Sequence, residues 1–279
     1  MTQQPGPVIV PLDGSHNAEN ALPAAKTIGA YYGAPLIFVH VVDPDDVPSG
    51  TDFAQAREVF GKYADELASR EGIAGASTHT AEGKPAATIL RYAREHQASA
   101  IVIASHGRGG FQATFVGSVA DRVARGAECP VLMVPATRES AVHGPVLIAV
   151  DGSPNAETAL AAGRSMAKHL GAQVALVSAY RMPPPVGVEF SYYSPSMVDS
   201  FREATEKYLQ DTCQGDEKGY AAQGPPAMVI VETANALDAG LVVVASSGKG
   251  LAERLTLGST TGRVMHTLNR PLLIVPAGD

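Results

Sequence analysis

The feature that most constrains this chain is an internal repeat. The segment Val8-Ile-Val-Pro-Leu-Asp13-Gly-Ser15 recurs 138 positions later as Val146-Leu-Ile-Ala-Val-Asp151-Gly-Ser153. Three further pairs of segments recur 141 positions apart: 83–86 with 224–227, 104–107 with 245–248, and 117–118 with 258–259. Such a repeat predicts two copies of one domain rather than a single large domain.

The boundary between the copies is expected in the polar segment 136–144, which gives domains of residues 1–140 and 141–279. Because the offset grows from 138 to 141, the second copy has gained three residues between its first two matching segments. We assign the gain to the Pro- and Tyr-rich stretch 182–195, which we predict to be a loop or a lid.

Within each copy, short apolar runs alternate with helical patterns. In the first copy we expect strands at 8–10, 36–42, 77–80, 101–103 and 131–134, and helices near 18–32, 54–70, 86–97 and 118–127. Strands that alternate with helices and are apolar on both faces predict an α/β fold, with a doubly wound five-stranded parallel sheet in each copy. The third strand of the second copy, at 218–222, is poor in strand-forming residues, and we expect it to be frayed.

Charge and composition exclude several classes of protein. The chain has 21 basic and 28 acidic residues, a net charge of −7, so we expect no nucleic-acid partner. No apolar run approaches the roughly 20 residues that cross a bilayer, and the first residues resemble no targeting signal, so we expect no membrane association. With only two cysteines, Cys129 and Cys213, a disulfide framework is excluded, and a cytoplasmic location is expected.

The most informative segment is a glycine-rich turn that follows a buried strand in each copy. In the first copy it runs from Ile101 to Ser118, and Gly117-Ser118 stands where a helix begins. Glycines allow close backbone approach to an anion, Ser118 is predicted to cap the helix, and the free amides of a helix N-terminus favour negative charge. We therefore predict a phosphate cradle, repeated in the second copy.

The carboxyl ends of the first and fourth strands lie side by side in a doubly wound sheet, where ligands bind at the switch point. Asp13 and Asp151 follow the first strand of each copy and can accept hydrogen bonds from ribose hydroxyls or an adenine amine. A nucleotide satisfies both the carboxylate and the cradle. Asp13 can equally close a local Asx turn, and it can do both.

In these motifs the chain resembles the universal stress proteins, in their tandem, ATP-binding form. That family carries G-x-x-G, nine residues, then G-[S/T]; here the counterparts run from Ala104 to Ser118 and from Ala245 to Ser259. The resemblance implies Rossmann-like domains with strand order 3-2-1-4-5, ATP with or without magnesium at each switch point, and fifth strands that pair across a dyad. Both copies carry alanine in place of the first motif glycine, and the methyl group of this alanine would crowd the ribose.

The resemblance also implies the site residues. Ribose and adenine contacts fall on Asp13 and Asp151 and near Val41 and Ala179; phosphate contacts fall on Gly107, Arg108, Gly117, Ser118, Val119, Gly248, Lys249, Gly258, Ser259 and Thr260. The candidate site is completed by neighbouring residues of the same turns, namely Pro11, Leu12, Ala104, Gly109, Val150, Ala245 and Gly250.

No catalytic residue and no metal site is assigned. The histidines at 16, 40, 79, 96, 143, 169 and 266 show no metal-binding spacing, and Cys129 is expected to be a buried, inert thiol. Ser105 and His106 are adjacent on a turn and are not expected to face each other, and His106 becomes Ser247 in the second copy.

Three functions remain open: an ATP-binding regulator of the stress response, a slow ATP hydrolase, and a nucleotide-free scaffold. No Walker A motif is present, and no general base is duplicated beside the phosphates, so turnover is expected to be slow at most. Further homodimerisation stays open, and the sequence assigns no downstream protein partner.

Overall fold

A computed structural model of the chain describes residues 5–46, 52–106, 116–135, 142–181, 195–247 and 257–277. Six residues of the predicted site lie outside these ranges: Gly107, Arg108 and Gly109 in the first copy, and Gly248, Lys249 and Gly250 in the second. Most of the loop predicted at 182–195 also lies outside them.

The first half contains five strands: β1 (Val8–Pro11), β2 (Leu36–Val42), β3 (Ser77–Glu82), β4 (Ala100–Ala104) and β5 (Val131–Val134). Its helices are α1 (His16–Glu19), α2 (Leu22–Tyr32), α3 (Phe53–Glu71), α4 (Pro85–Glu95) and α5 (Ser118–Gly126).

The second half repeats the pattern with five strands: β6 (Val146–Ala149), β7 (Val174–Tyr180), β8 (Lys218–Gln223), β9 (Leu241–Ala245) and β10 (Leu272–Val275). Its helices are α6 (Pro154–Leu170), α7 (Pro195–Thr212), α8 (Pro226–Ala236) and α9 (Ser259–Thr267).

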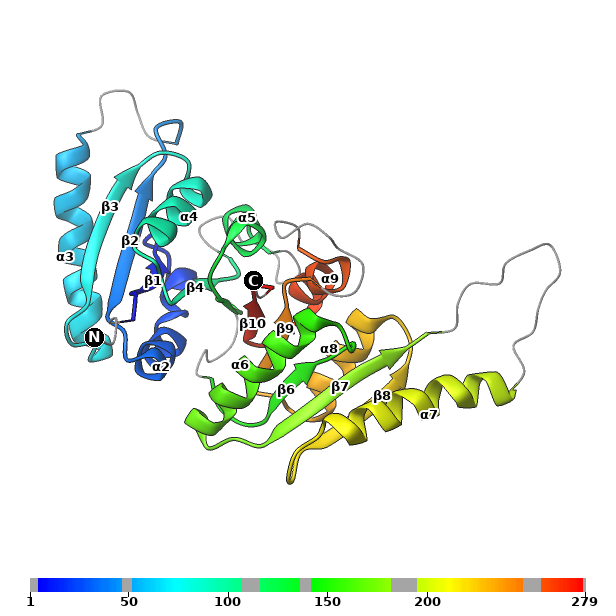
Figure 1. Cartoon of the computed structure of the whole chain (residues 1–279). Helices are drawn as coiled ribbons and strands as arrows, with labels where there is room; N and C mark the ends of the chain where they lie inside the picture. The colour runs from blue at the N-terminus through cyan, green and yellow to red at the C-terminus, as the bar shows by residue number, and fades with distance from the viewer. Residues whose placement is uncertain are drawn as a thin grey trace.

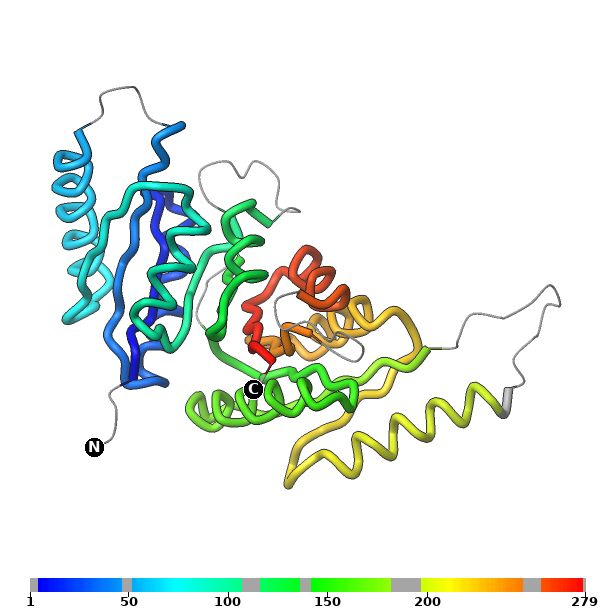
Figure 2. Tube along the Cα trace, turned by 45° about the horizontal axis from the view of Figure 1, so that its top comes forward, coloured from blue at the N-terminus to red at the C-terminus, as the bar shows by residue number. Residues whose placement is uncertain are grey.

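The strands form one continuous ten-stranded sheet of order β3-β2-β1-β4-β5-β10-β9-β6-β7-β8. Each half therefore has the predicted order 3-2-1-4-5, and within each half neighbouring strands are parallel. The halves meet where β5 and β10 pair antiparallel, with Leu272 opposite Met133. Figure 2 shows the two halves side by side, and the chain thus makes internally the fifth-strand pairing that was predicted.

Helices cover both faces of the sheet (Figure 1). One core packs α2, α3, α6 and α7 against the sheet around Phe38, Leu67 and Met166, all of which are fully buried. The other core packs α4, α5, α8 and α9 around Ile101 and Val123. Burial on both faces explains why the central strands read as continuous apolar runs.

The helix predicted at 18–32 is two helices, so this part of the prediction was wrong. Ser15 caps α1, which ends at Glu19, and α2 begins at Leu22 with Pro23 in its first turn. A proline ring clashes with the carbonyl group four residues earlier, here that of Glu19, and so prevents one continuous helix. In the second half Pro154 stands at the start of α6, where a proline is tolerated, and α6 is unbroken.

The prediction that the third strand of the second copy is frayed was also wrong. β8 pairs with β7 over six residues, from Ala175–Lys218 to Tyr180–Gln223. Leu209 of α7 packs over this strand, and a Cβ placed on Gly219 would lie 2.8 Å from its Cβ atom. Packing against a helix thus outweighs the weak strand propensity of the segment.

Candidate functional site

The site lies at the carboxyl edge of the sheet, where the first and fourth strands of each half end together. β1 pairs with β4 and β6 pairs with β9, so the turns that follow these strands are neighbours. The helix of the predicted cradle is tied to the same edge, because the amide of Gly117 donates to the carbonyl of Ser105 at 2.7 Å. Gly258 donates to Ser246 at the same distance in the second half.

In the second half this edge encloses a cavity of about 170 Å³. Its apolar lining comes from strands β6, β7 and β9 and from helices α6 and α8, and its polar lining comes from the turn after β6 and the start of α9. The lining residues are Ala149, Val150, Asp151, Ser153, Ala156, Val177, Ala179, Pro226, Ile230, Val244, Ala245, Ser247, Gly258, Ser259, Thr260 and Thr261.

Every described residue that the sequence assigns to the second site lines this cavity: Val150, Asp151, Ala179, Ala245, Gly258, Ser259 and Thr260. The structure therefore brings together residues that are up to 110 positions apart in the chain. Contact with a nucleotide stays a prediction for each of them.

The described site residues predicted in the first half lie at the carboxyl edge of the strands of that half. Pro11 ends β1, Ala104 ends β4, and Val41 lies one residue before the end of β2. Leu12 donates its amide to the carbonyl of Val39, as Val150 does to that of Val177 in the second half. At the other end of this site, Gly117 precedes α5, and Ser118 and Val119 form its first turn.

Sequence reasoning missed part of the cavity wall. Pro226 and Ile230 of α8 line it, and the signal was present, since the repeated Gly-x-Pro-Ala segment ends at Ala227. Ala156 lies in the alanine-rich stretch after the Asp-Gly-Ser turn, where a small side chain leaves room at the cavity. Thr261 was missed because its position in the first copy is Ala120.

Both candidate aspartates form an Asx turn. Oδ1 of Asp13 accepts from the amide of Ser15 at 3.0 Å and from its hydroxyl at 2.6 Å. Asp151 accepts from the amide of Ser153 at 2.9 Å. The Asx-turn role of Asp13 is thus observed, and its proposed contact with a ribose stays a prediction.

The helix-capping role predicted for Ser118 was wrong. Gly117 is the N-cap residue of α5, with extended backbone (φ −62°, ψ 147°), and Gly258 has the same place before α9. No side chain caps either helix. Uncapped amides at these two helix starts are available for an anionic ligand.

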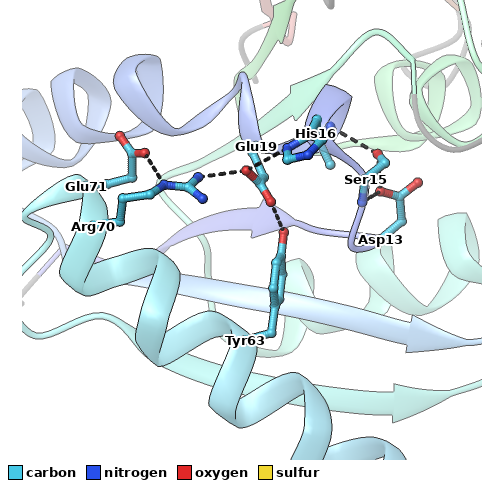
Figure 3. A network of polar contacts seen from close by, with 8 residues as sticks. Asp13, Ser15, His16, Glu19, Tyr63, Arg70 and Glu71 are labelled. Atoms are coloured by element: carbon cyan, nitrogen blue, oxygen red, sulfur yellow. Dashed lines mark hydrogen bonds and ion pairs between the residues drawn. The ribbon is translucent and has the colours of Figure 1, made fainter.

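A polar network holds the turn after β1 against α3 (Figure 3). Ser15 accepts from the amide of Ala18 and so caps α1. At the end of α1, Glu19 accepts from Tyr63 at 2.8 Å and from Arg70 at 2.7 Å. Burial alone would raise the pKa of Glu19, but hydrogen bonds from Arg70, Tyr63 and His16 outweigh burial and lower it.

Ser105 and His106 do face each other, contrary to the prediction. The Ser105 hydroxyl lies 2.9 Å from Nδ1 of His106, directly after β4. Burial lowers the pKa of His106. In the second half, Ser247 replaces His106 and accepts a hydrogen bond from Asn155 Nδ2 at 3.0 Å, while Thr261 donates to the carbonyl of Ala245 at 2.7 Å.

The described ranges contain no cluster of three or more histidine, cysteine or acidic side chains that could hold a metal ion. Burial raises the pKa of the Cys129 thiol to about 11, which agrees with the inert thiol expected there. Within the same ranges, no helix has both the length and the apolarity needed to cross a membrane.

Comparison with known families decides the classification. Residues 6–135 and 143–276 each match the Universal stress protein family, so both halves are covered by the same domain. The chain belongs to the universal stress protein family. The two matches fall on either side of the segment 136–142, in agreement with the two copies read from the repeat.

Related proteins have the same tandem arrangement. The chain is 27% identical to universal stress protein Rv2005c of Mycobacterium tuberculosis over 286 aligned residues, which cover 96% of both chains. Its fold is similar to that of a universal stress protein from Archaeoglobus fulgidus, with a TM-score of 0.71, 20% identity, and coverage of 99% of this chain and 100% of the other.

A further universal stress protein structure from Archaeoglobus fulgidus is a complex with dAMP. It is 27% identical to this chain, with a TM-score of 0.38 and coverage of 47% of this chain and 98% of the other.

Proposed function

We propose that this universal stress protein binds an adenine nucleotide, ATP foremost, at the carboxyl edge of each half of its sheet, and that binding serves regulation in the stress response. The observation that carries the proposal is the second-half cavity. Its walls match the three parts of a nucleotide: apolar side chains for the base, Asp151 for the ribose, and the start of α9 with Ser259 and Thr260 for a phosphate.

Magnesium is proposed only as a companion of the nucleotide. Asp151 is the single carboxylate among the residues that line the cavity, and it already accepts from the amide of Ser153. Magnesium usually binds through one or two carboxylates together with substrate phosphates. The described residues therefore do not form a magnesium site of their own, and no step is derived through the ion.

A regulatory role requires that the nucleotide prefer one conformation or assembly state of the protein. Light scattering on the purified chain, with and without ATP, measures whether copies associate further into a homodimer.

We place the protein in the cytoplasm, in keeping with Cys129 and Cys213, which are both free.

The deciding experiment begins with the purified full-length chain. Acid extraction followed by chromatography identifies any nucleotide that it carries, and calorimetric titration of the stripped protein with ATP, ADP and dAMP measures binding. We expect saturable binding of up to two nucleotides per chain. Absence of both a retained nucleotide and a heat of binding would overturn the proposal. Phosphate release in the presence of magnesium, at the turnover numbers usual for enzymes, would favour an ATPase instead.

A further inference from the structure

His106 carries a hydrogen-bonding atom that the fold leaves without a partner. Its Nε2 atom is inaccessible to solvent, and no hydrogen-bond partner for it exists among the described residues. Buried polar atoms in folded proteins are nearly always hydrogen-bonded, because an unpaired one costs about 1–3 kcal/mol. An unpaired nitrogen at the edge where a ligand is expected therefore indicates a partner that the ligand supplies.

Ser105 determines which kind of partner is needed. Burial lowers the pKa of His106 and so favours the neutral form of its ring. The Ser105 hydroxyl lies 2.9 Å from Nδ1, and it donates to that nitrogen or accepts from it according to the tautomer of the ring. A neutral imidazole that accepts at Nδ1 carries its one proton on Nε2. In the tautomer in which Ser105 donates, the unpaired Nε2 atom is a donor, and it requires an acceptor.

The position of His106 indicates which acceptor. The carbonyl of Ser105 accepts from the amide of Gly117, the N-cap of α5, so His106 lies beside the start of that helix. A Cβ placed on Gly117 would lie 3.8 Å from the Cα atom of His106. Uncapped amides at a helix start favour an anion, and a phosphate oxygen is a strong acceptor.

The second half is different at the same position. Ser247 is only 4% exposed, and its hydroxyl already accepts from Asn155 Nδ2 at 3.0 Å. A serine side chain is also too short to reach the place of an imidazole Nε2. The two halves therefore offer different chemistry to a ligand at this point of the site.

We propose that Nε2–H of His106 donates a hydrogen bond to a phosphate oxygen of the nucleotide in the first half, and that Ser247 leaves the second half without this contact. The two sites then differ in affinity, with His106 as the residue that distinguishes them. This inference rests on the proposed function, since it assigns one ligand contact within the proposed site.

The first test observes the ring directly in the wild-type chain. Histidine side chains are labelled with ¹⁵N, the His106 signals are assigned by their loss in a His106→Gln variant, and ATP is added. We expect the Nε2–H signal of His106 to shift saturably with ATP. The signals of His96 serve as the internal control and should not move, because His96 follows α4 and lies at the opposite edge of the sheet.

The second test compares two variants of one residue. Glutamine keeps an N–H donor near the position of Nε2, whereas asparagine places its amide near Nδ1. We expect His106→Asn to weaken one of the two ATP sites about tenfold, and His106→Gln to stay within about threefold of the wild type. His96→Asn is the matched control and should leave both affinities unchanged.

These outcomes separate the inference from the proposed function. If calorimetry shows no ATP binding to the wild-type chain, the proposed function fails. If ATP binds while the His106 signal stays in place, or His106→Asn binds ATP as the wild type does, the contact proposed for His106 is overturned and nucleotide binding stands.

Discussion

Nε2 of His266 lies 3.2 Å from Oδ1 of Asp121, and this contact joins the two halves of the chain. Asp121 is in α5 and His266 is in α9, the two helices that begin at the candidate nucleotide sites. Arg125, one turn beyond Asp121, binds the same carboxylate at 2.8 and 3.0 Å. One carboxylate therefore links both helices across the junction.

The repeat does not duplicate this contact. At an offset of 141, Arg125 corresponds to His266, and Asp121 corresponds to Gly262. Because glycine has no side chain, the second half offers no carboxylate in return, and a Cβ placed on Gly262 would lie 3.8 Å from Nη2 of Arg125. Asp121 therefore makes a contact across the junction that the second half does not return.

Replacement of Asp121 by asparagine is expected to lower the free energy of unfolding by about 1 kcal/mol at pH 7. Hydrogen bonds from Arg125 hold the pKa of Asp121 below its usual range. A carboxyl group with a lowered pKa stabilises the fold above its unfolded pKa and loses that contribution as the pH falls through its folded pKa. Urea unfolding should therefore separate wild type and Asp121→Asn at pH 7, and the difference in their free energies of unfolding should shrink as the pH falls below about 4.

The control for Asp121→Asn is Asp199→Asn. Asp199 pairs with Arg202 at 2.9 Å on the surface of α7, where both side chains are about half exposed. Exposed pairs of this kind contribute little, so the control should change the free energy of unfolding by no more than about 0.5 kcal/mol. Equal losses in the two variants would remove the special role assigned to Asp121.

The doubly wound parallel sheet could be predicted from the repeat and from the apolar strands, which permit few topologies, whereas the strand order 3-2-1-4-5 was implied by the resemblance to the universal stress proteins. The break between α1 and α2 could also have been read, since Pro23 stands four residues after Glu19. β8 could not, because its stability comes from pairing with β7 and from Leu209. Those contacts are tertiary, and strand propensity does not report them.

The candidate site was predictable to a similar extent. Motif residues such as Asp151 and Ser259 were found because they recur in register. Pro226 and Ile230 were missed because they reach the cavity from a helix that precedes the fourth strand of the half. The Ser105–His106 contact depends on side-chain rotamers after β4, which neighbouring positions in a sequence do not reveal.

A bulky side chain in the second-half cavity should remove binding there. Ala179 lies one residue before the end of β7 and lines the cavity, so phenylalanine at this position would fill much of the 170 Å³. We expect Ala179→Phe to weaken the second ATP site at least about tenfold and to leave the first site unchanged. Calorimetry with a two-site fit measures both affinities.

The matched control for Ala179→Phe is Ala236→Phe. Ala236 is exposed and ends α8, whereas the start of α8, at Pro226, lines the cavity. The control makes the same chemical change away from the cavity and should bind as the wild type does. Wild-type affinity at both sites in Ala179→Phe would show that the cavity is not where the nucleotide binds.

Cys129 should react slowly with thiol reagents in the folded protein. Burial raises the pKa of its thiol to about 11, so at pH 8 only about 0.1% is thiolate, against about a quarter for a free cysteine of pKa 8.5. In a Cys213→Ser background we expect reaction with Ellman's reagent to be at least about 100-fold slower than that of free cysteine, with full reaction once urea unfolds the chain. Rapid reaction of the folded protein would contradict the assignment of Cys129 as inert.

Glu19→Gln tests the network that holds the turn of the first site. The Glu19 side chain is 11% exposed and accepts from Tyr63 and Arg70. Hydrogen bonds to charged groups contribute about 1.5–3 kcal/mol, so we expect a loss of about 2 kcal/mol of unfolding free energy at pH 7. Because these hydrogen bonds lower the pKa of Glu19, the difference should shrink as the pH falls below about 4.

The same variant distinguishes a structural network from one that also positions the site. α1 connects Glu19 to Ser15, and Ser15 donates its hydroxyl to Asp13, so a loosened α1 should weaken ATP binding in the first half alone. The control is Glu58→Gln, since Glu58 forms an exposed pair with Lys62 on α3 and should change neither stability nor affinity by much. If Glu19→Gln loses stability while the first-half affinity is unchanged, the network supports the fold only, and Asp13 is held in place by its own Asx turn.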